Sequence, residues 1–224
     1  MAGKSGGGKA GASRSASARG LQQFPSTAAS DLINIAGMVF KANEVKEQIE
    51  VARKLKPNGA AILDVAQKWY MASERIGSSS KILKSAYKGL DIYWDGDAAE
   101  IFFDLMDDVT GVADGNRETL FEVGNAVVDL YNTAADGYNE AVLAIGSALK
   151  DVTPLDPDKQ REEVISVLET FMSGMNARRQ AIQHSLSAKQ AKMVELRGQI
   201  LQIQGVAPVP AGMTDMRKWE FDPR

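Results

Sequence analysis

The sequence contains no cysteine and only one histidine, and these two absences remove several kinds of chemistry. Without cysteine the chain forms no disulfide and offers no thiolate as a nucleophile or metal ligand. One histidine, His184, does not make a multi-histidine metal site, and it lies off the apolar stripe of its segment, where we expect it to be solvated. We therefore expect no catalytic residues, no bound metal and no cofactor.

Proline and long apolar runs are also scarce. No proline occurs between Pro57 and Pro154, and an interior proline would break a helix. No stretch of about twenty uncharged apolar residues exists, so we expect no transmembrane helix. No strand pattern stands out, and no glycine-rich phosphate loop follows one. The sequence predicts an all-α protein.

The first twenty residues carry Lys4, Lys9, Arg14 and Arg19 without any acid, among glycine, serine and alanine. This composition predicts a mobile basic tail, and we place its boundary at residues 1–29. It also lacks the apolar segment of a secretory signal peptide. Taking four positive charges from the formal net charge of −3 leaves −7 on residues 21–224, which disfavours nucleic acid as a partner.

Two long runs with apolar or small residues at alternating steps of three and four flank the tripeptide Trp94-Asp95-Gly96. Such steps form a heptad seam on a helix. At about 1.5 Å per residue, helices over 59–94 and 97–152 would reach roughly 50 and 80 Å, which suits an elongated bundle. The seam before the tripeptide contains Ile62, Ala66, Trp69, Ser73, Ile76, Ser80, Leu83, Tyr87, Leu90 and Trp94. The seam after it begins with Ala98, Phe102, Leu105 and Val109 and reaches Val152.

The tripeptide predicts a tight helical hairpin. Gly96 can adopt the positive backbone angles that end a helix, and Asp97 can cap the next helix with Glu100 reaching back. Trp94 then either covers the open end of the hairpin as a core residue or faces a partner. Acids gather around the turn, and we interpret them as a solvated face and a favourable helix start rather than a cation site. They are Asp91, Asp95, Asp97, Glu100, Asp104, Asp107 and Asp108.

One further helix is expected on each side of the hairpin. Ser30 can cap a helix over 30–56, and Asp156-Pro157 marks the start of another over 157–204. The predicted bundle therefore covers 30–204 with four helices, and 205–224, with Trp219 and Phe221, forms an irregular tail. Glycines at 77, 111 and 115 interrupt the hairpin composition. Because the apolar phase survives across them, we expect continuous helices. The other expectation for these small residues is that they let neighbouring helices approach closely.

Residues 60–152 resemble the WxG family of type VII secretion helical-hairpin proteins, which are early secreted antigen-like. The resemblance depends on the long helix, the Trp94-Asp95-Gly96 turn, Ala98, Ala99 and a phenylalanine at 102 or 103, and a second long helix. It implies a non-enzymatic substrate, adaptor or partner of type VII secretion, acting through helix–helix contacts. It also implies pairing with a helical partner or a second copy, and export without a cleaved signal peptide from the cytoplasm.

The chain departs from the family pattern beyond the second helix. Family export signals typically place an acid four residues after a tyrosine there, but Tyr131 is followed at that spacing by Ala135 and Tyr138 by Val142. The spacing occurs instead at Tyr87 and Asp91, before the turn. We take Trp94 and Gly96, extended by Tyr87 and Asp91, as the predicted partner-binding or secretion-signal residues. Two alternatives stay open: a scaffolding protein assembling through its heptad seams, and the delivery module of a secreted toxin.

Overall fold

The computed structural model describes residues 17–90 and 92–201, and this part of the chain is helical without a β-strand. The all-α fold class is thereby confirmed. These described residues form five helices: α1 (Ser26–Met38), α2 (Ala42–Lys54), α3 (Gly59–Lys88), α4 (Asp97–Val152) and α5 (Arg161–Leu201).

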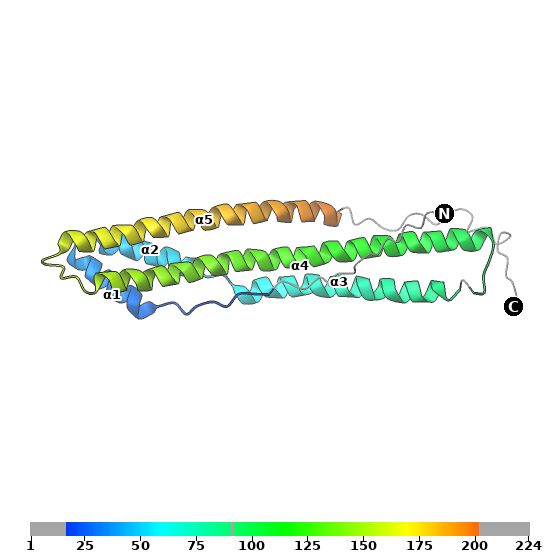
Figure 1. Ribbon diagram of the computed structural model, residues 1–224, viewed down its shortest axis with the longest axis horizontal. Helices are drawn as coiled ribbons and strands as arrows, with labels where there is room; N and C mark the ends of the chain where they lie inside the picture. Colours follow the sequence, from blue (N-terminus) through cyan, green and yellow to red (C-terminus); the bar gives the residue numbers. More distant parts are fainter. Residues whose placement is uncertain (1–16, 91, 202–224) are drawn as a thin grey trace, which may run out of the picture.

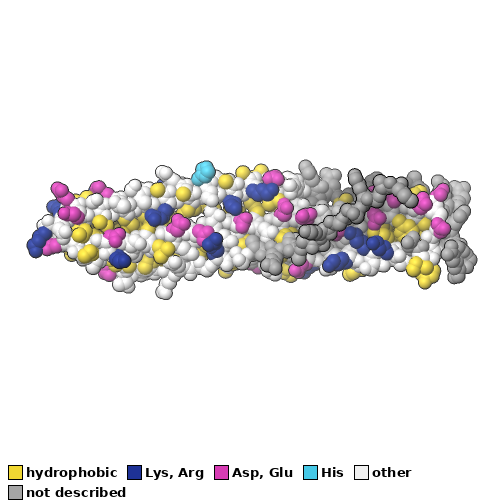
Figure 2. Space-filling model, viewed as in Figure 1, with side chains coloured by type: hydrophobic (Ala, Val, Ile, Leu, Met, Phe, Trp, Pro, Cys, Tyr) yellow, Lys and Arg dark blue, Asp and Glu magenta, His cyan; other side chains and the backbone are white. Residues whose placement is uncertain are grey.

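The molecule is a long rod with α4 running through it (Figure 1). Helix α3 lies antiparallel to the N-terminal half of α4, and α5 lies antiparallel to its C-terminal half. The short helices α1 and α2 pack beside α4 and α5 at the end opposite the α3–α4 connection. On the face shown in Figure 2, charged side chains of both signs are interspersed with small apolar patches.

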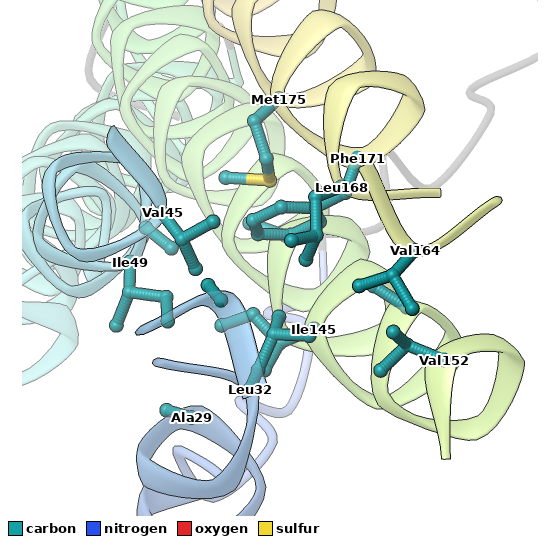
Figure 3. Packing of buried hydrophobic residues seen from close by; sticks show 14 of the residues in the cluster. Ala29, Leu32, Val45, Ile49, Ile145, Val152, Val164, Leu168, Phe171 and Met175 are labelled. Carbon is teal, nitrogen blue, oxygen red and sulfur yellow. The ribbon is translucent and has the colours of Figure 1, made fainter. Parts of the chain in front are cut away.

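The larger hydrophobic cluster lies where α1, α2, α4 and α5 meet (Figure 3). Its residues lie on one face of each helix, because helical spacing brings apolar side chains to the same side. Tight packing here holds the short helices against the long ones. The labelled members are Ala29, Leu32, Val45, Ile49, Ile145, Val152, Val164, Leu168, Phe171 and Met175.

A smaller cluster joins the N-terminal half of α3 to α4. Ala66, Val127 and Val128 are buried there, and Trp69 and Met193 pack against them. Along α3, each predicted seam position from Ile62 to Tyr87 is buried or partly buried. The predicted seam therefore is the face that α3 turns towards α4.

The predicted helix over 30–56 is wrong, because the chain forms two helices there. Helix α1 runs over Ser26–Met38, and Phe40, two residues after its end, is left-handed with φ 65°. The Lys41 N–H donates to the Ala36 carbonyl (2.8 Å) and the Phe40 N–H to the Gly37 carbonyl (3.2 Å), which is the Schellman pattern. Glycine usually occupies the left-handed position, so phenylalanine gives no sequence signal for this break.

Two other helix boundaries differ from the prediction. Helix α3 ends at Lys88 rather than 94, so an eight-residue connection, 89–96, replaces the expected tight turn. Helix α5 begins at Arg161, because Asp156 first forms a turn in which its carboxylate accepts the Asp158 N–H (3.0 Å). The range 97–152 for α4 is confirmed. The predicted residues 202–204 and the tail 205–224 lie outside the described residues.

Helices α3 and α4 pass through their internal glycines without a break, as predicted. Gly77 is a close contact, because a Cβ there would lie 2.7 Å from Cδ of Arg117. At Gly111 and Gly115 nothing lies within 4 Å of such a Cβ, so the expected close approach of helices is wrong at these two positions.

The predicted mobile tail over 1–29 is also wrong in its second half. Residues 17–25 run along α4 in an extended conformation, and 26–29 belong to α1. Ser30, the expected cap, lies inside α1 and donates to the Ser26 carbonyl (3.0 Å). Long-range hydrogen bonds hold the extended segment, and composition does not reveal them. Residues 1–16 lie outside the described part of the chain.

Candidate functional site: the α3–α4 tip

Three of the predicted site residues, Tyr87, Trp94 and Gly96, lie at the end of the rod where α3 connects to α4 (Figure 1). We call residues 87–90 and 92–103 the tip. Gly96 has φ 96° and ψ 174°, and its N–H donates to Asp95 Oδ1 (2.8 Å). A residue with a Cβ is strained at that φ, so the predicted need for a positive angle is confirmed.

Gly96 begins α4 rather than ending α3. Its carbonyl accepts the N–H groups of Ala99 (2.9 Å) and Glu100 (3.2 Å), the first bonds of the helix. Asp97 is the first helical residue, and no side chain caps the helix at this point. The predicted capping box of Asp97 and Glu100 is therefore wrong, although both acids lie in the first turn, where the helix dipole favours negative charge.

Trp94 packs on the first turns of α4. The centroid of its ring lies 5.1 Å from that of Phe102 and 6.1 Å from that of Phe103. The two phenylalanine rings meet edge to face at 5.6 Å. The backbone N–H of Trp94 donates to the Leu90 carbonyl (3.0 Å). The ring contacts with Phe102 and Phe103 hold the connection against the helix that follows it. Trp94 is partly buried, so it is neither a fully buried core residue nor a fully exposed residue that faces a partner.

Tyr87 turns inward. Its side chain is buried, its hydroxyl donates to the Asp107 carboxylate, and its ring lies 6.3 Å from that of Phe103. The hydrogen bond to Asp107, together with burial, raises the pKa of the Tyr87 hydroxyl. Tyr87 thus ties α3 to α4 beneath the surface. Asp91, predicted to act with it, lies outside the described residues.

The exposed apolar side chains of the tip are ones that sequence reasoning missed. Leu90 is 42% exposed, Ile92 71% and Tyr93 64%. All three lie in the connection itself. Leu90 continues the predicted seam, whereas no helical period marks Ile92 and Tyr93 as members of a face. The sequence did contain one indication of this exposed surface: a short apolar run, Leu90 to Tyr93, that an acid interrupts beside the end of a helix. Together with Trp94 they give the tip an apolar surface beside the exposed acids Asp95, Asp97 and Glu100.

Next to the tip, side-chain hydrogen bonds and an ion pair join α3 to α4. Asp114 accepts from the Ser80 hydroxyl (3.0 Å) and pairs with the Lys84 ammonium (2.7 Å). The hydrogen bond from Lys84 is the main reason that the pKa of Asp114 is lowered, and the same pair raises the pKa of Lys84. Further along, the Ser73 hydroxyl donates to the Arg117 carbonyl (2.8 Å). These directional bonds fix the register of the two helices.

Other kinds of site find little support in the described residues. Within 17–90 and 92–201, no three histidine, aspartate or glutamate side chains are grouped to hold a metal ion. His184 is exposed, as expected, and the one histidine stands on the surface in Figure 2. No helix in this part of the chain combines the length and apolar character needed to cross a membrane.

A surface groove runs between α4 and α5 on the bundle. It encloses about 400 Å³ and is lined by Ala144, Ala148, Val167 and Phe171, with Leu143, which is 58% exposed, at its edge. Glu140, Asp151 and Arg178 add charge to its wall. The groove brings apolar side chains of α4 and α5 together at the surface.

Comparison of the chain with protein-family models, with curated proteins and with solved structures finds no match.

Proposed function

We propose that this chain is a non-enzymatic protein of type VII secretion, a substrate or partner that works by protein contact. The surface that makes the contact is the tip. The observation that carries the proposal is the exposure of Leu90, Ile92 and Tyr93 together at the end of a two-helix arm. The resemblance of Trp94-Asp95-Gly96 and its flanking helices to the WxG family supplies the secretion context.

The physical support is the difference between the tip and an ordinary solvated turn. Exposed apolar side chains that cluster are typical of interaction surfaces, because a partner removes their area from water. Trp94 packs on Phe102 and Phe103, so the loop that carries them stays in place and little order has to be gained on binding. The nearby acids favour a partner whose rim is basic and would steer its approach.

Two isoleucines of equal exposure provide a matched test. Ile92, in the tip, and Ile82, on α3, are each 71% exposed. In a host with a type VII secretion system, Ile92→Ser combined with Tyr93→Ser is expected to reduce the protein in the culture supernatant at least tenfold, with cytosolic protein retained. Ile82→Ser is expected to export like the unchanged chain. Equal export of all three proteins refutes the proposed role of the tip.

Trp94 and Gly96 act in this proposal by positioning the apolar loop. Gly96→Ala is strained at φ 96° and Trp94→Ala removes the contacts to Phe102 and Phe103, so both are expected to reduce export without unfolding the helices. Circular dichroism at 222 nm checks that the helices persist. Export of both variants at the unchanged level, with normal helix content, would contradict the positioning role.

The groove between α4 and α5 favours one alternative, a scaffolding protein that assembles by helix contacts. This alternative predicts a concentration-dependent oligomer that Leu143→Lys disrupts and that Ile92→Ser leaves intact. Sedimentation measurements on the two variants distinguish the functions. If only Leu143→Lys disrupts the oligomer, and the tip substitutions leave export unchanged, the chain is a scaffolding protein.

A further inference from the structure

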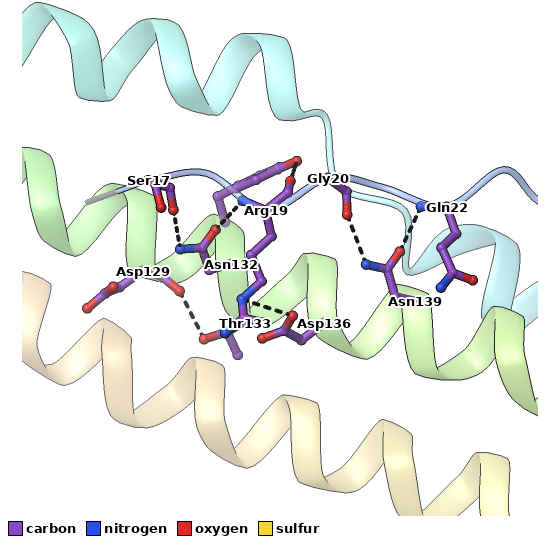
Figure 4. Close-up of polar contacts among 10 residues, drawn as sticks. Ser17, Arg19, Gly20, Gln22, Asp129, Asn132, Thr133, Asp136 and Asn139 are labelled. Atoms are coloured by element: carbon purple, nitrogen blue, oxygen red, sulfur yellow. Dashed lines mark hydrogen bonds and ion pairs between the residues drawn. The ribbon is translucent and has the colours of Figure 1, made fainter. Parts of the chain in front are cut away.

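Residues 17–22 bind to α4 as an extended peptide through two asparagines (Figure 4). The Asn132 side chain accepts the Arg19 N–H (2.9 Å) and donates to the Ser17 carbonyl (3.0 Å). The Asn139 side chain repeats the arrangement, accepting the Gln22 N–H (2.8 Å) and donating to the Gly20 carbonyl (2.9 Å). Each amide therefore pairs with the backbone of two residues in the manner of a neighbouring strand. We call Asn132 and Asn139 the asparagine ladder.

The spacing of the ladder matches an extended backbone. Asn132 and Asn139 are seven residues apart, which is about 10.5 Å along a helix. The two N–H donors, on Arg19 and Gln22, are three residues apart, which is about 10 Å along an extended chain. The match makes the ladder complementary to any peptide backbone in this conformation, whatever its side chains.

Two neighbouring residues of α4 add specificity for one position. The Tyr131 hydroxyl donates to the Arg19 carbonyl (2.7 Å), and the Arg19 guanidinium pairs with Asp136 (3.2 Å). The Tyr131 ring itself is buried against the start of α3, where a Cβ on Gly59 would lie 2.9 Å from it. The donor is thus held in place before any peptide binds. The site therefore recognises the backbone of an extended segment and one cationic side chain.

The bound segment itself adds little to the hydrophobic core. Residues 17–20 and Gln22 are exposed, and Leu21 is only partly buried. Its bonds to the ladder are at the surface, where water can replace them. Both asparagines belong to the continuous helix α4, so the ladder keeps its spacing when the segment leaves.

We propose that Asn132 and Asn139, with Tyr131 and Asp136, form a binding site for an extended, arginine-bearing segment of a partner protein. Residues 17–22 are its tethered occupant, and the partner's segment takes their place. The charge of Asp136 at the position of the Arg19 guanidinium selects a cation there. The site lies on the side of α4 in the middle of the rod and does not depend on the proposed role of the tip.

The test uses the full chain with its tethered segment weakened. Arg19→Pro combined with Gln22→Pro removes both N–H donors and leaves the ladder unchanged. A fluorescent synthetic peptide with the sequence of residues 17–24 is then titrated in a fluorescence anisotropy assay. We expect it to bind this variant at least tenfold tighter than the unchanged chain, whose site is occupied. Adding Asn132→Ala and Asn139→Ala is expected to weaken binding at least tenfold.

Two control peptides separate backbone recognition from general attraction. Methylation of the backbone nitrogens of Arg19 and Gln22 is expected to abolish binding, and Arg19→Glu in the peptide is expected to weaken it severalfold. Equal binding to chains with and without the asparagines overturns the proposal. Absence of binding at millimolar peptide also overturns it and leaves the segment as a structural staple.

Amide hydrogen exchange in the unchanged chain provides a second readout. Asn132→Ala is expected to accelerate exchange at Arg19, and Asn139→Ala at Gln22, each at least tenfold and each without effect on α4 amides. Unchanged exchange at both sites refutes the ladder. A dimer of the unchanged chain that disappears when both asparagines are replaced would assign the site to a second copy and overturn the assignment to a partner protein.

Discussion

Replacing Gly124 with alanine tests how closely α3 packs on α4. A Cβ at this position would lie 2.5 Å from Cε1 and 2.7 Å from Cδ1 of Tyr70, well inside van der Waals contact. The Tyr70 ring is held on two sides, because its hydroxyl donates to Asn125 Oδ1 (2.8 Å) and its centroid lies 5.3 Å from that of Phe121. The substitution must therefore move the ring or separate the helices.

The magnitude follows from three contributions. Overpacking a well-filled contact costs about 1–3 kcal/mol. Displacing the hydroxyl from Asn125 costs about 1 kcal/mol, since the net contribution of a protein hydrogen bond is of that size. Alanine in place of glycine inside a helix returns about 1 kcal/mol. We expect Gly124→Ala to lower the free energy of unfolding by about 1–3 kcal/mol.

The same substitution at Gly115 is the matched control. Gly115 lies in the same helix, but nothing is within 4 Å of its Cβ position. Only the helix preference remains, so Gly115→Ala is expected to raise the free energy of unfolding by up to about 1 kcal/mol.

Urea denaturation followed by circular dichroism measures both effects, and each kcal/mol corresponds to a shift in Tm of about 2–4 °C for a chain of this size. If Gly124→Ala proves as stable as Gly115→Ala, the close contact between α3 and α4 does not exist in solution and the reasoning is refuted.

Three further substitutions have defined outcomes. Phe40→Gly is expected to raise the free energy of unfolding by about 1 kcal/mol in urea, because φ 65° costs a residue with a Cβ about that much and the side chain is 79% exposed; a loss would show that its contact with Arg161 dominates. Asp114→Asn is expected to lower stability at neutral pH by at most about 0.5 kcal/mol, since the pair with Lys84 is part-exposed. Because the pKa of Asp114 is lowered in the folded state, the stabilisation is present above its ordinary pKa and disappears as pH falls through the folded value, so the two proteins should converge in acid; a constant gap from neutral to acid pH would contradict this. Tyr138→Phe is expected to raise Tm by a few degrees in calorimetry, because the fully buried hydroxyl has no hydrogen-bond partner among the described residues and removing it relieves about 1 kcal/mol of desolvation; a lower Tm would reveal a partner.

The long helices could be predicted from the sequence because their signal is local. Apolar residues at steps of three and four face one side of a helix whatever they pack against, and this pattern marked the bounds of α4 and the face that α3 presents to it. At the C-terminal end of α3, the same pattern predicted a longer helix than the structure contains. Leu90 and Trp94 continue the seam in phase, but the chain leaves the helix after Lys88, and Trp94 packs on Phe102 instead.

The candidate site was predicted only in part, because some of its features are local and others depend on contacts with α4. The turn chemistry at Gly96 is a property of one residue, and it was correctly expected to take a positive φ. The exposure of Ile92 and Tyr93 depends on how the connection lies over α4, which no local pattern encodes. Tyr87 was predicted, with Asp91, to bind a partner. In the structure its hydroxyl instead donates to Asp107 on the facing helix, a contact that the sequence does not reveal.

By itself the sequence determined that this protein is helical, that its longest helix runs over 97–152, and that Gly96 takes a positive φ, because each of these depends on neighbours within a few turns. Tertiary structure decided where the remaining helices end and that residues 17–22 lie along α4. Arg19 is fixed by Asn132, a residue 113 positions away, and Phe40 adopts a left-handed conformation that its own side chain disfavours. Contacts between distant residues add free energy that local preferences do not contain, and where the two conflict the packed arrangement prevails.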